Sequence, residues 1–237
     1  MIGVFDYTVI LTYMSLLSAT IGIIICLDGV GHPFYGIFFL LLSGLCDTFD
    51  GRVARSKKNR TDREKSFGVQ IDSLADLVAF GVLPACIGMA TIKANTKLTY
   101  IPHLKLLDAN DERILYPIVL ICIALFYVLA AMIRLAWFNV LDEEKKHGIG
   151  HAQSGYVGLP VTSSALIFPA VMLIGFIFKK DYAVIYFIVM LITGLLFLGK
   201  FRIPKPGLKL ILIMIVVGAV EFLILMLLYR HVIVLPF

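Results

Sequence analysis

The chain has 237 residues, of which 60% are hydrophobic and only 16% are charged, and its formal net charge is +5. A soluble domain carries about 25% charged residues, and one of this size exposes too much surface to hide so many apolar side chains. The composition therefore excludes a soluble enzyme, a disordered regulator and a disulfide-stapled secreted domain. It predicts an integral membrane protein whose basic loops face anionic lipid headgroups, with no nucleic-acid partner.

Seven stretches of the chain are apolar enough to cross a bilayer, which takes about 20 residues. They are Tyr7–Leu27, Pro33–Ala54, Gly68–Ile92, Leu115–Phe138, Tyr156–Phe178, Tyr182–Gly199 and Gly207–Tyr229. The alternating pattern of a membrane barrel is missing from the sequence. We therefore expect an all-α fold, a polytopic bundle of seven transmembrane helices with six or eight also possible. We expect one catalytic domain over residues 1–237, to which residues 179–237 add C-terminal helices.

A basic loop between the second and third predicted spans indicates the orientation in the membrane. Between Gly51 and Phe67, seven lysines and arginines stand against two acidic residues. Loops rich in lysine and arginine stay on the cytoplasmic side of the cell membrane. We expect this loop, Leu141–Gly155 and Lys200–Gly207 to face the cytoplasm, and the long stretch Lys93–Arg113 to lie outside.

Four aspartates stand on either side of this basic loop, at the ends of two consecutive spans. They are Asp47, Asp50, Asp72 and Asp76. Spacings of three and four residues put each pair on one helical face, so two neighbouring helices would aim all four carboxylates at one point. Two divalent cations would balance the four negative charges, and oxygen ligands suit Mg²⁺ or Mn²⁺. The competing interpretation is a set of solvated helix ends paired with nearby arginines.

Small residues are interleaved with these carboxylates. The chain reads D-T-F-D-G-R-V-A-R over residues 47–55 and G-V-Q-I-D-S-L-A-D over residues 68–76. Glycine and alanine let a bulky ligand approach the backbone closely. The pattern resembles the signature of the CDP-alcohol phosphatidyltransferases, and the resemblance covers the chain from the first span to about Pro169. One segment departs from the family, because Ser56–Phe67 is longer than the usual spacer.

The resemblance implies a role for each matched residue. The four aspartates are then metal ligands, and Asp76 is also the general base. The residues that receive the cytidine and the pyrophosphate are Gly51, Ala54, Arg55 and Gly68. In the first span, Thr12 and Ser15 match a Thr-x-x-Asn pattern of the family loosely. Taken by themselves, these two favour hydrogen bonds to their own helix over contact with a nucleotide.

The resemblance also implies a reaction. The family transfers a phosphatidyl or archaetidyl group from a CDP-linked lipid, such as CDP-diacylglycerol, to an alcohol and releases CMP. Paired metal ions would neutralise the pyrophosphate, and a carboxylate would take the proton of the alcohol. The family further implies a homodimer.

Three other stretches favour L-serine as the alcohol. They are similar to segments of the smaller membrane-embedded phosphatidylserine synthases: Leu77–Ala85, Arg134–Asn139 (R-L-A-W-F-N) and Tyr156–Val161 (Y-V-G-L-P-V). Arg134 is the best-placed arginine to hold the serine carboxylate, because its fork geometry suits that group. Asn139 is a weaker candidate for the same pocket. An ion pair of Arg134 with Asp142, or extension of its side chain to the membrane surface, is the competing interpretation.

Two alternatives stay open on the sequence. The same chemistry with glycerol phosphate or inositol phosphate would use Arg55, Arg134 and the basic loop to hold the additional phosphate. A cation channel or transporter would use the acidic cluster as its ion site. Against transport, the chain has no evident internal repeat and the acids stand at the edges of the spans. Glu221 is expected to contact a neighbouring helix or a lipid headgroup.

Overall fold

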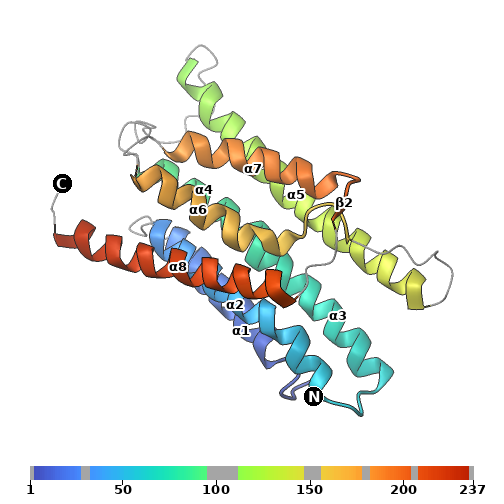
Figure 1. Cartoon of the computed structure of the whole chain (residues 1–237). Helices are drawn as coiled ribbons and strands as arrows, with labels where there is room; N and C mark the ends of the chain where they lie inside the picture. Colours follow the sequence, from blue (N-terminus) through green and yellow to red (C-terminus); the bar gives the residue numbers. More distant parts are fainter. Residues whose placement is uncertain are drawn as a thin grey trace.

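The computed structural model describes residues 3–27, 33–94, 112–146, 156–177, 182–203 and 208–234. These residues form a bundle of helices (Figure 1). The helices are α1 (Ile10–Leu27), α2 (Pro33–Ser56), α3 (Asp62–Asp76), α4 (Leu83–Ala94), α5 (Glu112–Lys146), α6 (Ser164–Ile177), α7 (Tyr182–Leu198) and α8 (Leu208–Val234). A π-helical segment, η1 (Leu77–Val82), joins α3 to α4, and a 3-10 turn, η2 (Val161–Ser163), leads into α6. The expected all-α bundle is confirmed, with a helix in each of the seven predicted stretches.

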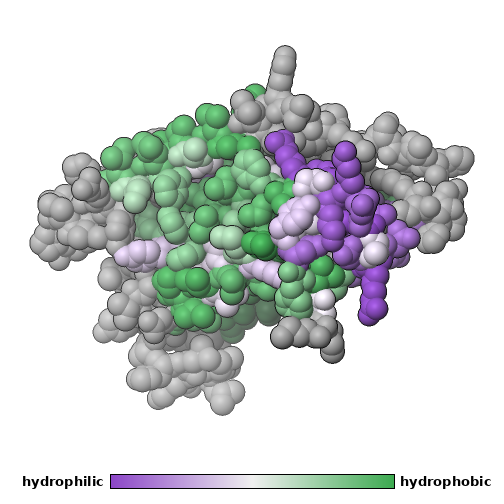
Figure 2. All heavy atoms as spheres, turned by 90° about the horizontal axis from the view of Figure 1, so that it is seen from below, coloured by the Kyte–Doolittle hydropathy of each residue, from purple (hydrophilic) through white to green (hydrophobic). Residues whose placement is uncertain are grey.

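Several helices have the length and composition of membrane spans. Within the described residues, the runs long and apolar enough to cross a membrane are Ile10–Leu27, Asp62–Ile92 and Ile118–Glu144. Shorter apolar helices lie at Val161–Gly175, Ala183–Leu198 and Ile213–Ile224. Viewed from below, the described surface divides into a hydrophilic end and a broad hydrophobic face (Figure 2). A bundle that is apolar inside and outside suits a bilayer, so the chain is an integral membrane protein.

Two predicted boundaries are corrected. The fifth predicted span begins as extended chain, in which β1 (Tyr156–Val157) pairs antiparallel with β2 (Arg202–Ile203), because Gly158 has a φ of +76° and Pro160 keeps an extended backbone. The helix α5 continues to Lys146 through residues that we expected in a loop, since Glu and Lys are good helix formers.

Parts of the predicted loops cannot be compared with the structure. Residues 95–111 of the stretch Lys93–Arg113 lie outside the described residues, as do 147–155 and 204–207 of the two loops expected to face the cytoplasm.

Small and hydroxylated residues bring α1 and α2 into close contact. A Cβ added at Gly22 would stand 2.9 Å from Cβ of Phe39, so glycine is needed for this approach. The hydroxyl of Ser43 donates to the carbonyl of Ser15 (3.0 Å), and Ser18 donates to the carbonyl of Phe39 (2.9 Å). This packing sets the orientation of α2, which carries the first two aspartates.

The π-helical segment after Asp76 opens the helical hydrogen-bond ladder at a proline. The N–H of Leu83 reaches back to the carbonyl of Val78, and Pro84 has no N–H to offer the carbonyl of Phe80. The Tyr127 hydroxyl of α5 donates to that carbonyl instead (2.6 Å). Two further hydrogen bonds complete the arrangement: Tyr127 with Ser164 (2.7 Å) and Tyr186 with the Pro84 carbonyl (2.9 Å). Helices α5 and α7 therefore hold the turn that follows Asp76.

Candidate active site

The four aspartates of the motif meet between α2 and α3. One carboxylate oxygen from each of Asp47, Asp50 and Asp72 lies within 4.8 Å of the others. Asp76 is buried, and its carboxyl group lies next to that of Asp47. Asp50 is also buried, whereas Asp47 and Asp72 are half-buried. The two helices thus bring together carboxylates that are up to 29 residues apart in the numbering of the chain.

This carboxylate cluster fits a divalent cation. All its donors are hard oxygen atoms, which Mg²⁺ and Mn²⁺ prefer. Side-chain ion pairs within 4.0 Å, over the described ranges, join Lys57 to Asp6, Lys57 to Glu64 and Lys65 to Asp62. None involves the cluster, so the interpretation of the aspartates as partners of nearby arginines is not supported. Carboxylates this close repel one another when ionised, and a bound cation relieves that repulsion.

A hydroxyl from α1 supports the cluster. Thr12 donates to Oδ2 of Asp50 over 3.2 Å in a buried contact. Ser15, one turn further along α1, donates to the carbonyl of Ser43 over 3.4 Å. Both side chains therefore bond α2, and the expectation that they bond their own helix was wrong. The reason is the close approach of α1 and α2, which places acceptors of α2 within reach of both hydroxyls.

Both glycines of the motif lie against an arginine side chain. A Cβ added at Gly51 would stand 3.3 Å from Nη1 of Arg55, and one at Gly68 would stand 2.7 Å from Nη2 of Arg60. The guanidinium of Arg60 also donates to the carbonyls of Ala54 (3.4 Å) and Glu64 (3.2 Å). Arg60 was not among the predicted site residues, since it lies in the segment that departs from the family pattern and no spacing rule marks it.

The residues expected around the acceptor lie on α5. The amide of Asn139 donates to the hydroxyl of Ser73 (2.9 Å), and that hydroxyl donates back to Oδ1 of Asn139 (3.1 Å). These two hydrogen bonds join α5 to α3 at the residue that follows Asp72. Arg134 is only 5% exposed, and its Nε donates to the carbonyl of Leu159 (3.2 Å).

The elements that carry the three stretches expected to favour serine, α5, η1 and the chain leading into η2, contact one another. Arg134 binds the backbone at Leu159, and Tyr127 of α5 joins Phe80 to Ser164. A Cβ added at Gly158 would stand 2.8 Å from the carbonyl oxygen of Gly199, so only glycine fits this turn. Helix α5 thereby contacts both the π-helical segment and the chain around residues 158–164.

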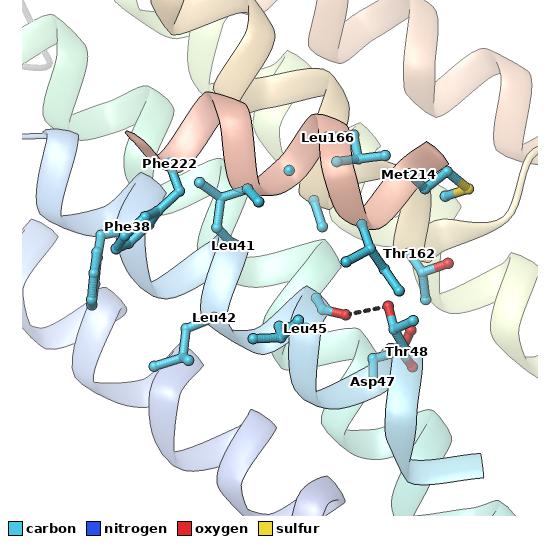
Figure 3. A pocket seen from close by; sticks show the side chains of 15 residues that line it. Phe38, Leu41, Leu42, Leu45, Asp47, Thr48, Thr162, Leu166, Met214 and Phe222 are labelled. Carbon is cyan, nitrogen blue, oxygen red and sulfur yellow. Dashed lines mark hydrogen bonds between the residues drawn. The ribbon is translucent and has the colours of Figure 1, made fainter. Parts of the chain in front are cut away.

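An apolar pocket of about 320 Å³ opens beside the cluster. Asp47 and Thr48 of α2 lie at one end, together with Thr162, and Phe38 and Phe222 lie at the other (Figure 3). Between these ends the walls are almost wholly aliphatic and come from α2, α6 and α8. The pocket thus connects a carboxylate of the site to a groove suited to a hydrocarbon chain.

Charged residues tie the chain before α1 to the α2–α3 turn, which is at the bottom of Figure 1. The Lys57 ammonium binds Asp6 (2.7 Å) and Glu64 (2.9 Å). The hydrogen bond from Lys57 lowers the pKa of Asp6 to about 2, with the hydrogen bond from Thr8 as a second cause. The same contacts with Asp6 and Glu64 raise the pKa of Lys57. Thr61 then begins α3 with a capping box to Glu64.

Comparison with known protein families decides the assignment. Residues 7–235 match the family model of the CDP-alcohol phosphatidyltransferases. The chain belongs to this family. The resemblance carried by the aspartate and glycine spacing is therefore confirmed, and it extends beyond Pro169 into the C-terminal helices.

Individual relatives are named for serine as the acceptor. The chain is 27% identical to a CDP-diacylglycerol–serine O-phosphatidyltransferase of Methanocaldococcus jannaschii, over 70% of this chain and 62% of that protein. It is 34% identical to the protein of that name from Saccharomyces cerevisiae, over 66% of this chain and 50% of that protein. An archaetidylserine synthase of Methanothermobacter thermautotrophicus is 28% identical, over 81% of this chain and 68% of that protein. The chain thus matches between 50% and 68% of the length of these relatives.

Proposed function

We propose that the protein transfers a phosphatidyl or archaetidyl group from a CDP-linked lipid to the hydroxyl of L-serine and releases CMP. The observation that carries this proposal is the convergence of Asp47, Asp50 and Asp72 within 4.8 Å, with Asp76 buried beside them. Family membership supports the reaction class, and the names of the relatives support serine as the acceptor.

The four aspartates would hold two divalent cations, Mg²⁺ or Mn²⁺. Bound there, the cations neutralise the diphosphate of the substrate and stabilise the charge that develops on the departing CMP. Thr12 fixes the rotamer of Asp50 by its hydrogen bond to Oδ2. Residues that orient a ligand carboxylate in this way tune the affinity of a metal site.

The proton of the acceptor goes to Asp76. The serine hydroxyl oxygen attacks the lipid-side phosphorus and forms a new P–O bond, while the P–O bond to CMP breaks and CMP leaves with its electron pair. Asp76 is the deepest carboxylate on α3, next to the π-helical segment, and it takes the hydroxyl proton as general base. Its burial excludes bulk water, which would otherwise compete with serine for the phosphorus.

Small and basic residues would bind the nucleotide end of the substrate. Gly51, Ala54 and Gly68 carry a small side chain or none, so only arginine side chains would have to turn aside for the cytidine and the diphosphate, and Arg55 supplies positive charge beside Gly51. Thr12 and Ser15 lie on α1 and bond α2. Thr12 would affect substrate binding indirectly, through its hydrogen bond to Asp50.

The lipid and serine would approach from different sides. The apolar pocket beside Asp47 suits a hydrocarbon tail of the substrate, because its walls are aliphatic and Phe38 and Phe222 line the end away from Asp47. Asn139 of α5 bonds Ser73 of α3, and Arg134 lies five residues, about 1.4 turns, before it on the same helix. We assign both to the acceptor, with the guanidinium of Arg134 binding the serine carboxylate.

The basic α2–α3 turn favours the cytoplasmic side of the cell membrane for this site. Exposed cations of this turn and its flanks are Arg52, Arg55, Lys58, Arg63 and Lys65. Soluble serine, water-soluble CMP and a membrane lipid can then meet at one interface.

The proposal is tested with purified protein, CDP-diacylglycerol, Mg²⁺ or Mn²⁺ and a panel of acceptors. CMP release should depend on L-serine, and mass spectrometry should find phosphatidylserine as the product. Glycerol phosphate and inositol phosphate serve as competing acceptors, and faster turnover with either would reject serine. Asp76→Asn should lower kcat by about 10²- to 10⁴-fold, the usual contribution of a general base. A rate for Asp76→Asn near that of the unmutated protein would remove Asp76 from this role.

A further inference from the structure

Arg60 has no role in the proposed binding of metal, lipid or serine. Its guanidinium covers Gly68, with Nη2 2.7 Å from the place where a Cβ would stand. It spans the gap between α2 and α3, because it donates to the carbonyls of Ala54 on α2 and Glu64 on α3. Gly68 lies four residues before Asp72 and therefore about one helical turn from the carboxylate cluster on the same face.

Among the described residues, the two backbone hydrogen bonds of Arg60 leave its charge without a paired carboxylate and its Nε donor without a partner. A guanidinium has five N–H donors, and the two carbonyl contacts employ only the Nη atoms. Its Nε is buried and has no hydrogen-bond partner in the described part of the chain. Over the same residues, no carboxylate lies within 4.0 Å of it, because the nearby Glu64 is paired with Lys57. A buried donor without a partner costs free energy, so a native protein has a reason to keep one.

A phosphate group would both neutralise the charge of Arg60 and accept a hydrogen bond from its Nε. Arginine binds phosphate through two parallel N–H bonds, which would engage Nε together with one Nη. A phosphate that reaches Nε displaces no bulky side chain of Ala54 or Gly68, because these residues carry a methyl group and no side chain. Carboxylate ligands are unsuitable this close to the acidic cluster, whereas a substrate diphosphate is attracted by cations that the cluster holds.

We propose that Arg60 pairs with a phosphate of the nucleotide-linked substrate, through Nε and an Nη, and so positions the diphosphate over Gly68 and the carboxylate cluster. This inference rests on the proposed function and deepens it. It also assigns a function to the lengthened segment between Arg55 and Gly68, because this segment places the Arg60 guanidinium beside Gly68. Arg60 is then a substrate-binding residue distinct from the acceptor residues on α5.

The test compares ligands that differ by one phosphate. Binding of CMP and of cytidine is measured by calorimetry in the presence of Mg²⁺, on the full chain and on Arg60→Gln. We expect the Kd of CMP to rise about 10- to 100-fold, the range for a lost charge-assisted hydrogen bond. Cytidine binding should change little, and Arg60→Lys should recover part of the CMP affinity because it keeps the charge. In turnover assays the KM for CDP-lipid should rise while the KM for serine stays nearly the same.

Two further variants separate this role from general damage. Arg63→Gln removes an equal charge from an exposed position at the start of α3 and should leave CMP binding unchanged. Gly68→Ala keeps Arg60 but displaces its guanidinium, so it should weaken CMP more than cytidine.

The possible failures are distinguishable. Equal losses for CMP and cytidine, or none for either, in Arg60→Gln would overturn the inference and leave the proposed function intact. A wild-type protein that neither binds CMP nor releases it from CDP-lipid would overturn both.

Discussion

The carboxylate cluster lies on α2 and α3, and the Thr12 hydroxyl connects α1 to it through a hydrogen bond to Asp50. This hydrogen bond crosses 38 positions of sequence and lies in a buried part of the bundle. The spacing of the aspartates predicts that they share a face, because helical periodicity alone decides this. It does not predict a partner on another helix, and neither Thr12 nor Arg60 could be assigned its contact before the packing of α1, α2 and the turn was known.

We predict that Thr12→Val weakens metal binding more than it weakens folding. Valine keeps the shape of threonine and removes the donor to Asp50. Loss of a residue that orients a metal ligand costs about 10- to 100-fold in metal affinity, so the Mg²⁺ concentration for half-maximal activity should rise by that factor. Thr20→Val is the matched control, because the Thr20 hydroxyl is exposed and bonds the Leu16 carbonyl of its own helix. Equal metal requirements in the two variants would contradict the role of Thr12.

Hydroxyls of α5 and α7 hold the backbone between η1 and α4, and one of them replaces a missing helical hydrogen bond. Pro84 leaves the Phe80 carbonyl without its helical donor, and Tyr127 and Tyr186 supply hydroxyls to this region from α5 and α7. The apolar stretch Gly68–Ile92 predicts a continuous span, and the helical run is continuous. The π-helical segment within it was not predicted, since it depends on tyrosines more than 40 residues further along the chain.

Tyr127→Phe should lower both stability and kcat, whereas Tyr186→Phe should lower stability alone. Tyr127→Phe leaves the buried Phe80 carbonyl without a donor, at a cost of about 1–3 kcal/mol. Tyr186→Phe removes a second donor from the Pro84 carbonyl, which keeps the N–H of Gly88 within α4. Only the Phe80 carbonyl belongs to the segment that directly follows Asp76. Thermal melting and steady-state kinetics on both variants check this prediction. If kcat falls equally in the two, the π-helical segment does not position Asp76.

The ion pair between Lys57 and Asp6 predicts how the contribution of the α2–α3 turn to stability depends on pH. Asp6 has its pKa lowered to about 2, so its contribution to stability is present above its ordinary pKa of 3.8 and is lost as the pH falls through about 2. Lys57 has its pKa raised, so its contribution is present below the ordinary value of 10.5 and is lost only above the raised one.

Between about pH 5 and pH 9 the contact should therefore add a constant amount to stability. Melting temperatures of the unmutated protein and of Asp6→Asn, measured across this range, should run parallel, with the variant lower. Curves that converge within the range would show that another group controls this turn.

At the scale of the whole molecule, the described surface has a hydrophilic end and a hydrophobic face (Figure 2). This division suits a protein that binds a membrane lipid and a water-soluble substrate at one interface. The carboxylate cluster lies where α2 and α3 approach their shared turn, and the apolar pocket runs from Asp47 toward Phe38 and Phe222. The composition predicts the membrane class and the aspartate spacing predicts the cluster. The pocket was not predicted, because α6 and α8 form its wall only after the chain has folded back on α2.

The most direct test of this account is the rate of serine-dependent CMP release from CDP-lipid, measured during titration of chelated protein with Mg²⁺. We expect no turnover in excess chelator and full recovery as Mg²⁺ is restored. Asp72→Asn should require far more Mg²⁺, since it removes one of the three clustered carboxylates. Undiminished turnover in excess chelator, or an unchanged Mg²⁺ requirement in Asp72→Asn, would contradict the assignment of the carboxylate cluster as the metal-dependent centre of the reaction.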